Sequence, residues 1–135
     1  MMEAANPIVP CQVILVEDDD ALRRSLQLLI TGQGYEVMAF SSPKAAVSSP
    51  AAASASCLVI DYLLPQYDGI EALRLFRAGG AGGRAILMTA YHTPELQDVA
   101  LRAGFTAVLP KPFRTEDLIR ALGNSPSSRA MPVPS

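Results

Sequence analysis

Short apolar runs alternate with longer amphipathic segments along this chain. The strong runs are CQVILV at 11–16, CLVI at 57–60, AILM at 85–88 and AVL at 107–109, and YEVMAF at 35–40 is a weaker one. The strong runs lack the strict alternation of apolar and polar positions that marks a strand with one wet face, so burial on both faces is indicated. They predict the strands of a parallel sheet covered by helices.

The segments between these runs carry apolar residues at the spacing of a helix. After the first run, Asp19 or Asp20 is placed to cap a helix that Gly32 and Gly34 would end. Four more helices are expected: one after Ser42-Pro43, one over 70–76, one after Thr93-Pro94 and one after Thr115. The Ala- and Ser-rich stretch at 45–56 leaves the end of the second helix undefined. Five strand–helix repeats with short connections predict a doubly wound α/β sheet.

Length and composition narrow the picture to one intracellular domain. The 135 residues suit a single core, which we expect at 10–124, while the Ser- and Pro-rich segment 125–135 predicts a linker or a disordered tail. A net charge of −2 offers no broad basic surface, so direct nucleic-acid binding by this segment is not expected. No apolar run approaches the roughly 20 residues of a membrane span, and no secretion signal is recognisable. Cys11 and Cys57 open apolar runs and are expected as buried thiols in a reducing cytoplasm.

Polar residues stand just past the ends of the predicted strands. Glu17 and Asp18 follow the first run, Asp61 follows the run at 57–60, Thr89 follows the next, and Lys111 follows the last after one proline. In an open α/β sheet the carboxyl ends of the strands meet at one edge, where ligands bind. We therefore expect three carboxylates, a hydroxyl and an ammonium to share one rim.

Taken alone, each carboxylate could be an ordinary helix cap. Three of them crowded together repel one another unless a cation joins them, and Lys111 supplies only one positive charge. Hard oxygen ligands with the remaining positions filled by water suit Mg²⁺. The pattern favours a metal-assisted function for Glu17, Asp18 and Asp61.

Four stretches in this order and spacing resemble the receiver domain of two-component response regulators: VILVEDDDALRRSL, LVIDYLLPQYDGIEAL, ILMTAY and LPKPF. The resemblance covers residues 11–122. It implies a five-stranded parallel sheet of flavodoxin-like order 2-1-3-4-5 flanked by five helices. It also implies a phosphorylation-dependent signalling switch that catalyses its own phosphorylation and dephosphorylation, and is not an enzyme of metabolism.

The resemblance assigns roles to residues of this sequence. Asp61 matches the phosphoacceptor, which takes a phosphoryl group from a sensor histidine kinase, a phosphotransfer protein or acetyl phosphate. Asp18 matches a direct Mg²⁺ ligand, Glu17 a ligand through water, and the backbone carbonyl of Leu63 the third protein ligand. Lys111 matches the cation that neutralises the phosphoryl oxygens.

The same resemblance describes how phosphorylation is transmitted, and here the sequence departs from it. Thr89 matches the hydroxyl that moves toward the phosphoryl group, and the bond from Lys111 to Pro112 is expected to be cis. Val108 stands where the family usually has a tyrosine or phenylalanine, so the relay from the threonine to that aromatic is either altered or runs through other residues. Phe105 and Tyr91, which lie nearby in sequence, are the candidate substitutes, although Phe105 is expected in the core and Tyr91 in a loop. Gly69 is expected to permit close packing at the start of the third helix.

Partners follow from the resemblance as well. We expect an output domain or a partner protein downstream; any DNA-binding region would lie beyond Ser135, and a stand-alone regulator is equally allowed. A phosphorylation-dependent homodimer would use the fourth helix, fifth strand and fifth helix.

Other classes of protein remain as alternatives. A non-phosphorylated pseudo-receiver that acts as a protein-binding module is weakened because all the matching site residues are present. A phosphatase of the haloacid dehalogenase kind needs a second aspartate two residues after Asp61, where Leu63 stands. A flavodoxin relative needs a Ser-, Thr- and Gly-rich phosphate loop after the first strand, and none follows it.

Overall fold

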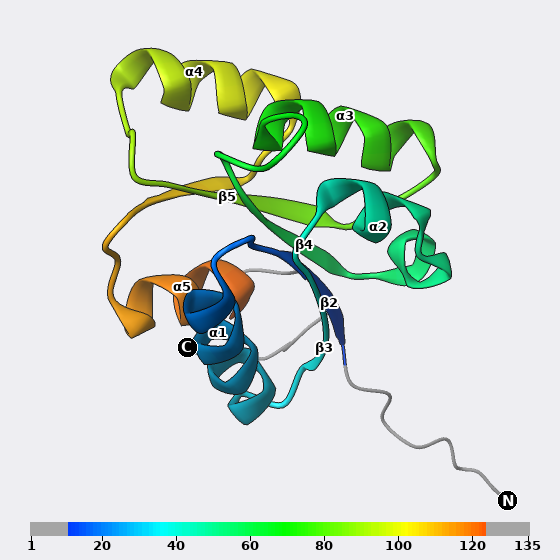
Figure 1. The fold of residues 1–135 in the computed structure, drawn as a ribbon. Coiled ribbons are helices and arrows are strands. Elements are labelled where there is room, and N and C mark those ends of the chain that lie inside the picture. The colour runs from blue at the N-terminus through cyan, green and yellow to red at the C-terminus, as the bar shows by residue number, and fades with distance from the viewer. Residues whose placement is uncertain (1–10, 124–135) are drawn as a thin grey trace, which may run out of the picture.

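The computed structural model, described for residues 11–123, is a five-stranded parallel sheet between two layers of helices (Figure 1). The strands are β2 (Gln12–Val16), β3 (Glu36–Phe40), β4 (Cys57–Asp61), β5 (Arg84–Thr89) and β6 (Ala107–Pro110). They lie in the order β3-β2-β4-β5-β6, which is 2-1-3-4-5 counted along the chain. The predicted fold and strand order are confirmed. The predicted tail at 125–135 lies outside the described residues.

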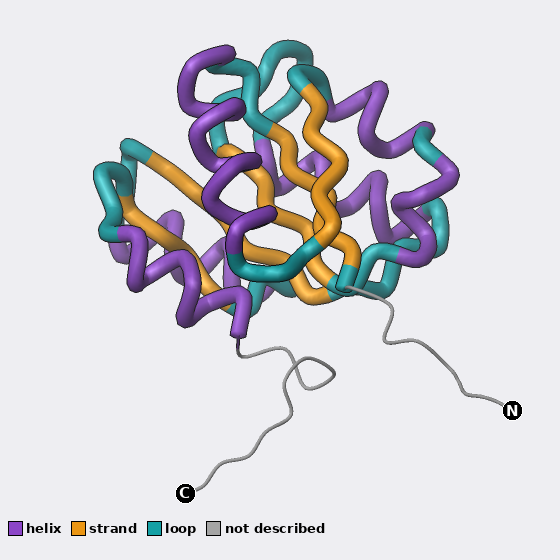
Figure 2. The backbone as a smooth tube through the Cα atoms, turned by 90° about the horizontal axis from the view of Figure 1, so that it is seen from below, coloured by secondary structure: helices purple, strands orange, loops and turns teal. Residues whose placement is uncertain are grey.

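Helices cover both faces of this sheet. They are α1 (Asp20–Gly32), α2 (Pro43–Ser48), α3 (Gly69–Ala78), α4 (Pro94–Ala103) and α5 (Thr115–Gly123), with a short 3₁₀ helix η1 (Pro50–Ser54). In Figure 1, α2, α3 and α4 lie above the sheet and α1 and α5 below it, and Figure 2 shows helices flanking the strands from the underside.

The central strands are buried on both sides, which explains their unbroken apolar runs. On β2, Ile14 and Val16 face the cluster under α2, α3 and α4, whereas Val13 and Leu15 face the cluster under α1 and α5. All four side chains are fully buried, and each such burial stabilises the fold by about 1.5–3 kcal/mol. Cys57 is buried in the second cluster and Cys11 is half-buried beside it, both as free thiols.

The helix starts follow the predicted caps. Of the two candidates for α1, Asp19 is the cap, and its carboxylate accepts the Leu22 N–H at 2.9 Å. The second helix ends sooner than its Ala-rich sequence would allow. Ser49 is extended because Pro50 follows it, and Pro50 has no N–H to continue the helix.

In the part of the chain that the structure describes, every helix is too short or too polar to cross a lipid bilayer.

Candidate functional site

The carboxyl ends of four neighbouring strands bring the predicted site residues to one edge of the sheet. Val16 pairs with Ile60, so the residues that follow them, Glu17 and Asp61, lie at the same level of adjacent strands. Thr89 pairs with Pro110 at the end of the next ladder, which sets Lys111 just beyond the rim. Residues 94 positions apart in sequence, Glu17 and Lys111, therefore meet at one place.

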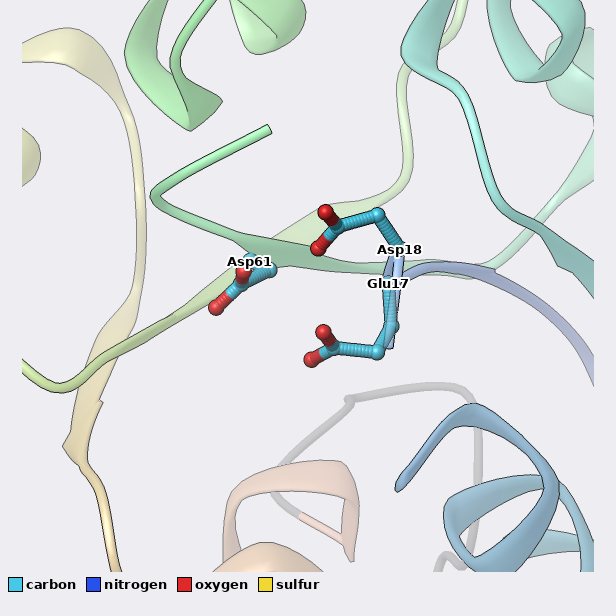
Figure 3. A group of neighbouring side chains, drawn as sticks. All are labelled: Glu17, Asp18 and Asp61. Atoms are coloured by element: carbon cyan, nitrogen blue, oxygen red, sulfur yellow. The ribbon is translucent and has the colours of Figure 1, made fainter. Parts of the chain in front are cut away.

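Three carboxylates converge there (Figure 3). Glu17, Asp18 and Asp61 each offer one oxygen, and these three oxygens lie within 4.8 Å of one another. Glu17 and Asp61 are buried, with 1% and 6% of their surface exposed, whereas Asp18 is exposed. Two of the carboxylates are thus shielded from water, and the third is exposed to it.

Lys111 holds the two buried carboxylates together. Its Nζ lies 2.9 Å from Asp61 Oδ1 and 3.0 Å from Glu17 Oε1. Its backbone N–H donates to the Thr89 carbonyl at 2.7 Å, and the bond to Pro112 is cis, as expected. One ammonium against three carboxylates leaves the cluster with two uncompensated negative charges.

Burial, together with the neighbouring charges, shifts the pKa values of the buried groups. Burial raises the pKa of Glu17 and of Asp61, and the nearby charge of Asp61 on the first and of Asp18 on the second raises each further. The hydrogen bonds from Lys111 oppose both shifts without cancelling them. For Lys111, burial acts to lower the pKa, but the bonds and charges of Asp61 and Glu17 outweigh it and raise the pKa. The site therefore favours an added positive charge.

The cluster opens into a cavity of about 320 Å³. Its walls are the four charged residues together with Leu63, Ala90 and Tyr91. Tyr91 is 60% exposed and Leu63 50% exposed. Ala90 and Tyr91 are not among the site residues predicted from the sequence, although their position directly after Thr89 was the available signal.

Thr89 lies at the rim but does not line this cavity. It is buried, and its hydroxyl accepts the N–H of Tyr91 at 2.9 Å. Val108 is partly buried and packs against the apolar cluster under α2, α3 and α4. Of the two positions of the expected relay, Thr89 is thus bonded to the backbone that follows it and Val108 is packed in the apolar cluster.

The start of α3 packs directly against the strand that carries Asp61. Asp68 caps the helix through the Glu71 N–H at 2.9 Å, and the Gly69 N–H donates to the Tyr62 carbonyl at 2.7 Å. A Cβ on Gly69 would lie 2.7 Å from the carbonyl oxygen of Asp61. The expectation that this glycine permits close packing is confirmed.

The donor set fits a hard divalent cation. All the ligand atoms available are oxygens, which Mg²⁺ prefers, and the two uncompensated charges match its charge. The cavity leaves room for water or a ligand beside the carboxylates. Glu17, Asp18 and Asp61 are the side chains that could hold it, and Leu63 lines the same cavity.

Comparison with known proteins gives one consistent result. Residues 13–123 match the response regulator receiver domain family. The chain is 31% identical over 111 residues to the response regulator MprA of Mycolicibacterium vanbaalenii, covering 82% of this chain and 48% of that protein. It is 33% identical over 114 residues to the MprA of Mycobacterium leprae, covering 82% and 50%. The chain thus spans about half the length of the curated relatives it matches.

Solved structures agree in fold. The chemotaxis protein CheY4 of Vibrio cholerae superposes with a TM-score of 0.79 at 23% identity, covering 87% of this chain and 99% of that one. The CheY-like response regulator receiver domain protein from Methanospirillum hungatei gives a TM-score of 0.75 at 24% identity, covering 84% of this chain and 91% of that one.

Proposed function

The chain belongs to the response regulator receiver domain family of two-component systems, and we propose that it is a phosphorylation-dependent switch with Asp61 as its phosphoacceptor. One observation carries the proposal: the Lys111 ammonium bridges Asp61 and Glu17 at 2.9 and 3.0 Å beside the third carboxylate. Lys111 thus lies within reach of a phosphoryl group attached to Asp61.

The proposed step is phosphoryl transfer to a carboxylate. An oxygen of Asp61 forms a bond to phosphorus while the bond from phosphorus to the donor's histidine nitrogen breaks. The donor imidazole keeps the electron pair of that bond and takes up a proton. In the step that ends the signal, water attacks phosphorus, inorganic phosphate leaves and the Asp61 carboxylate is restored.

Each neighbour of Asp61 has a part in this step. Lys111 neutralises charge on the phosphoryl oxygens, because its ammonium already sits 2.9 Å from the carboxylate that attacks. Glu17 holds Lys111 from the other side. Asp18, Glu17, Asp61 and the carbonyl of Leu63 would hold Mg²⁺. When bound, Mg²⁺ supplies positive charge that lets the crowded carboxylates and the incoming phosphoryl group coexist.

Transmission of the signal would start at Thr89. Its hydroxyl oxygen accepts a hydrogen bond from the Tyr91 N–H, and its O–H would donate to a phosphoryl oxygen on Asp61 once the side chain turns toward that oxygen. A rotation of Thr89 moves the β5–α4 connection. Because Val108 is too small for a large inward swing, we propose that this connection, and not an aromatic at position 108, carries the change to α4.

Membership of this family supports two kinds of partner, one that donates the phosphoryl group and one that responds to the phosphorylated state. We propose that a sensor histidine kinase or a phosphotransfer protein supplies the phosphoryl group. The switched surface acts on an output domain or a partner protein. A phosphorylation-dependent homodimer through α4, β6 and α5 is the form we propose for the active state; analytical ultracentrifugation with and without beryllofluoride would reveal it, and a monomer in both conditions would rule it out.

The pseudo-receiver alternative gains no support from the comparisons or from the site. The predicted site residues Glu17, Asp18, Asp61, Thr89 and Lys111 are all present. The Lys111 ammonium lies within 3.0 Å of two of the carboxylates, and the three carboxylates each offer an oxygen within 4.8 Å of the others.

The function is tested by the intact mass of the protein after incubation with acetyl phosphate and Mg²⁺. We expect one added phosphoryl group in the wild type and in Asp98→Asn, which removes an exposed carboxylate of α4, and none in Asp61→Asn. Chelation of Mg²⁺ should abolish the adduct. A wild-type protein that gains no phosphoryl group from acetyl phosphate and binds no beryllofluoride would contradict the proposal.

A further inference from the structure

The turn between β2 and α1 is anchored on both sides of Asp18. The Glu17 N–H donates to the Phe40 carbonyl at 3.0 Å, and the Glu17 side chain accepts the Asp19 N–H at 3.2 Å. The Asp19 carboxylate is used as the cap of α1. Among residues 11–123, no hydrogen bond or ion pair holds the Asp18 carboxylate. It is the part of the turn that faces the other two carboxylates.

Arg23, which lies in the first turn of the helix α1, makes hydrogen bonds to the connection between β2 and α1. Its Nη1 donates to the backbone carbonyl of Glu17 at 2.9 Å and its Nη2 to the Asp20 carboxylate at 2.7 Å. The side chain of Arg23 is 22% exposed, whereas that of Asp20 is 81% exposed. The bond to the Glu17 carbonyl is therefore the sheltered one, and it is the one expected to persist in water.

The consequence is a set position for the backbone of Asp18. The backbone of Glu17 is fixed through its N–H by β3 and through its carbonyl by Arg23, and Asp19 is fixed by the helix it caps. With its neighbours on both sides anchored, the backbone of Asp18 is held where its carboxylate reaches to within 4.8 Å of those of Glu17 and Asp61. Groups that orient metal ligands in this way commonly contribute about 10- to 100-fold to metal affinity.

We propose that Arg23 is a positioning residue for the divalent-cation site, holding the β2–α1 turn so that Asp18 faces Glu17 and Asp61. The inference rests on the proposed function, because it takes that site as the place where Mg²⁺ binds. Arg23 itself does not line the cavity beside the carboxylates.

The positive charge of Arg23 and its hydrogen bond to the turn are expected to change Mg²⁺ affinity in opposite directions, which makes the proposal testable. A guanidinium repels a divalent cation, so loss of its charge alone should strengthen Mg²⁺ binding. Loss of the turn's anchor should weaken binding. The sign of the change therefore separates a positioning role from a background charge.

The test is the Mg²⁺ dissociation constant, measured by isothermal titration calorimetry on the full chain at fixed pH and ionic strength. Arg23→Gln should weaken binding about tenfold, and Arg23→Lys, which keeps the charge and one donor, should fall between it and the wild type. Arg24→Gln is the matched control: Arg24 is exposed and makes no hydrogen bond or ion pair within the described residues. It should bind as tightly as the wild type or slightly more tightly.

Metal-free melting temperatures of the same variants separate loss of the turn from loss of the fold. If Arg23→Gln does not fold, Arg23→Lys decides, since it changes geometry at constant charge. Wild-type affinity or tighter in a folded Arg23 variant would overturn the proposal while leaving the phosphoacceptor function intact. A wild type that binds no Mg²⁺ at millimolar concentration would overturn both.

Discussion

Replacing Asp61 with asparagine is expected to make the metal-free protein more stable, although it removes the proposed acceptor. The native pKa of Asp61 is raised above 3.8 by burial and by the charge of Asp18. A raised carboxyl pKa means that the folded state binds the proton more tightly than the unfolded chain does. Above the native pKa, ionised Asp61 therefore destabilises the fold, and the neutral amide of the Asp61→Asn variant removes that cost.

The size of the expected gain in stability follows from electrostatic interaction energies that nearly cancel. At an effective dielectric constant of about 20, like charges at the 4.8 Å limit within which the carboxylate oxygens lie repel by about 3.5 kcal/mol, and the lysine at 2.9 Å attracts by about 6 kcal/mol. The repulsion from exposed Asp18 is further weakened by solvent, so the attraction and the two repulsions roughly balance. What is left is the cost of burying the carboxylate, and we expect a gain of about 1 kcal/mol, or about 4 °C in melting temperature.

The assay is thermal unfolding followed by circular dichroism, in EDTA and in millimolar Mg²⁺. In EDTA at neutral pH, Asp61→Asn should melt above the wild type, and this advantage should be lost as the pH falls toward 3.8 and the wild-type carboxyl is protonated. Mg²⁺ should raise the melting temperature of the wild type more than that of the variant. Asp98→Asn, which changes the net charge equally from an exposed site, should gain nothing. A metal-free Asp61→Asn that melts below the wild type would refute the reasoning.

Three further changes can be checked by chemical denaturation. Gly69→Ala should destabilise by about 2 kcal/mol, because its Cβ would lie 2.7 Å from the Asp61 carbonyl oxygen and from Leu87 Cδ1; an unchanged midpoint would mean that α3 moves aside freely. Gly32→Ala, with nothing within 4 Å of the new Cβ, should stabilise by about 0.5–1 kcal/mol, and a loss would contradict this. Burial raises the pKa of the Cys57 thiol to about 12, so the folded state keeps this proton as pH rises past the unfolded value of 9.0. The free energy of unfolding should then fall by about 1.4 kcal/mol between about pH 8 and pH 10, and a Cys57→Ala variant that falls as steeply would show that the thiol is not the cause.

Much of the fold is readable from sequence because burial on both faces leaves a simple signature. The runs at 11–16, 57–60 and 85–88 are apolar without alternation, and each became a central strand within one residue of its predicted ends. Once the strands are parallel, their carboxyl ends share an edge, so the meeting of Glu17, Asp61 and Lys111 follows from strand order alone. The exception is the Ala- and Ser-rich stretch, where small residues fit several local structures and Pro50 decided where the helix ends.

The contacts that refine the site could not be predicted in this way. That Lys111 bridges two carboxylates, and that the Thr89 hydroxyl accepts the Tyr91 N–H, depend on side-chain conformations set by packing. The bond from Arg23 to the Glu17 carbonyl joins a helix to a strand end through a flexible side chain, and no spacing rule predicts it. Sequence locates the charged groups, whereas their partners are settled by the folded surroundings.

The central claim is that Asp61 takes the phosphoryl group, and chemical trapping in the wild-type protein tests it most directly. Borohydride reduces an acyl phosphate to an alcohol, so treatment after acetyl phosphate and Mg²⁺ should convert the acceptor aspartate into homoserine. Peptide mass spectrometry should find this change at position 61 alone, and only in the sample that received the phosphoryl donor. Homoserine at Asp18 or at another carboxylate, with position 61 unmodified, would contradict the account.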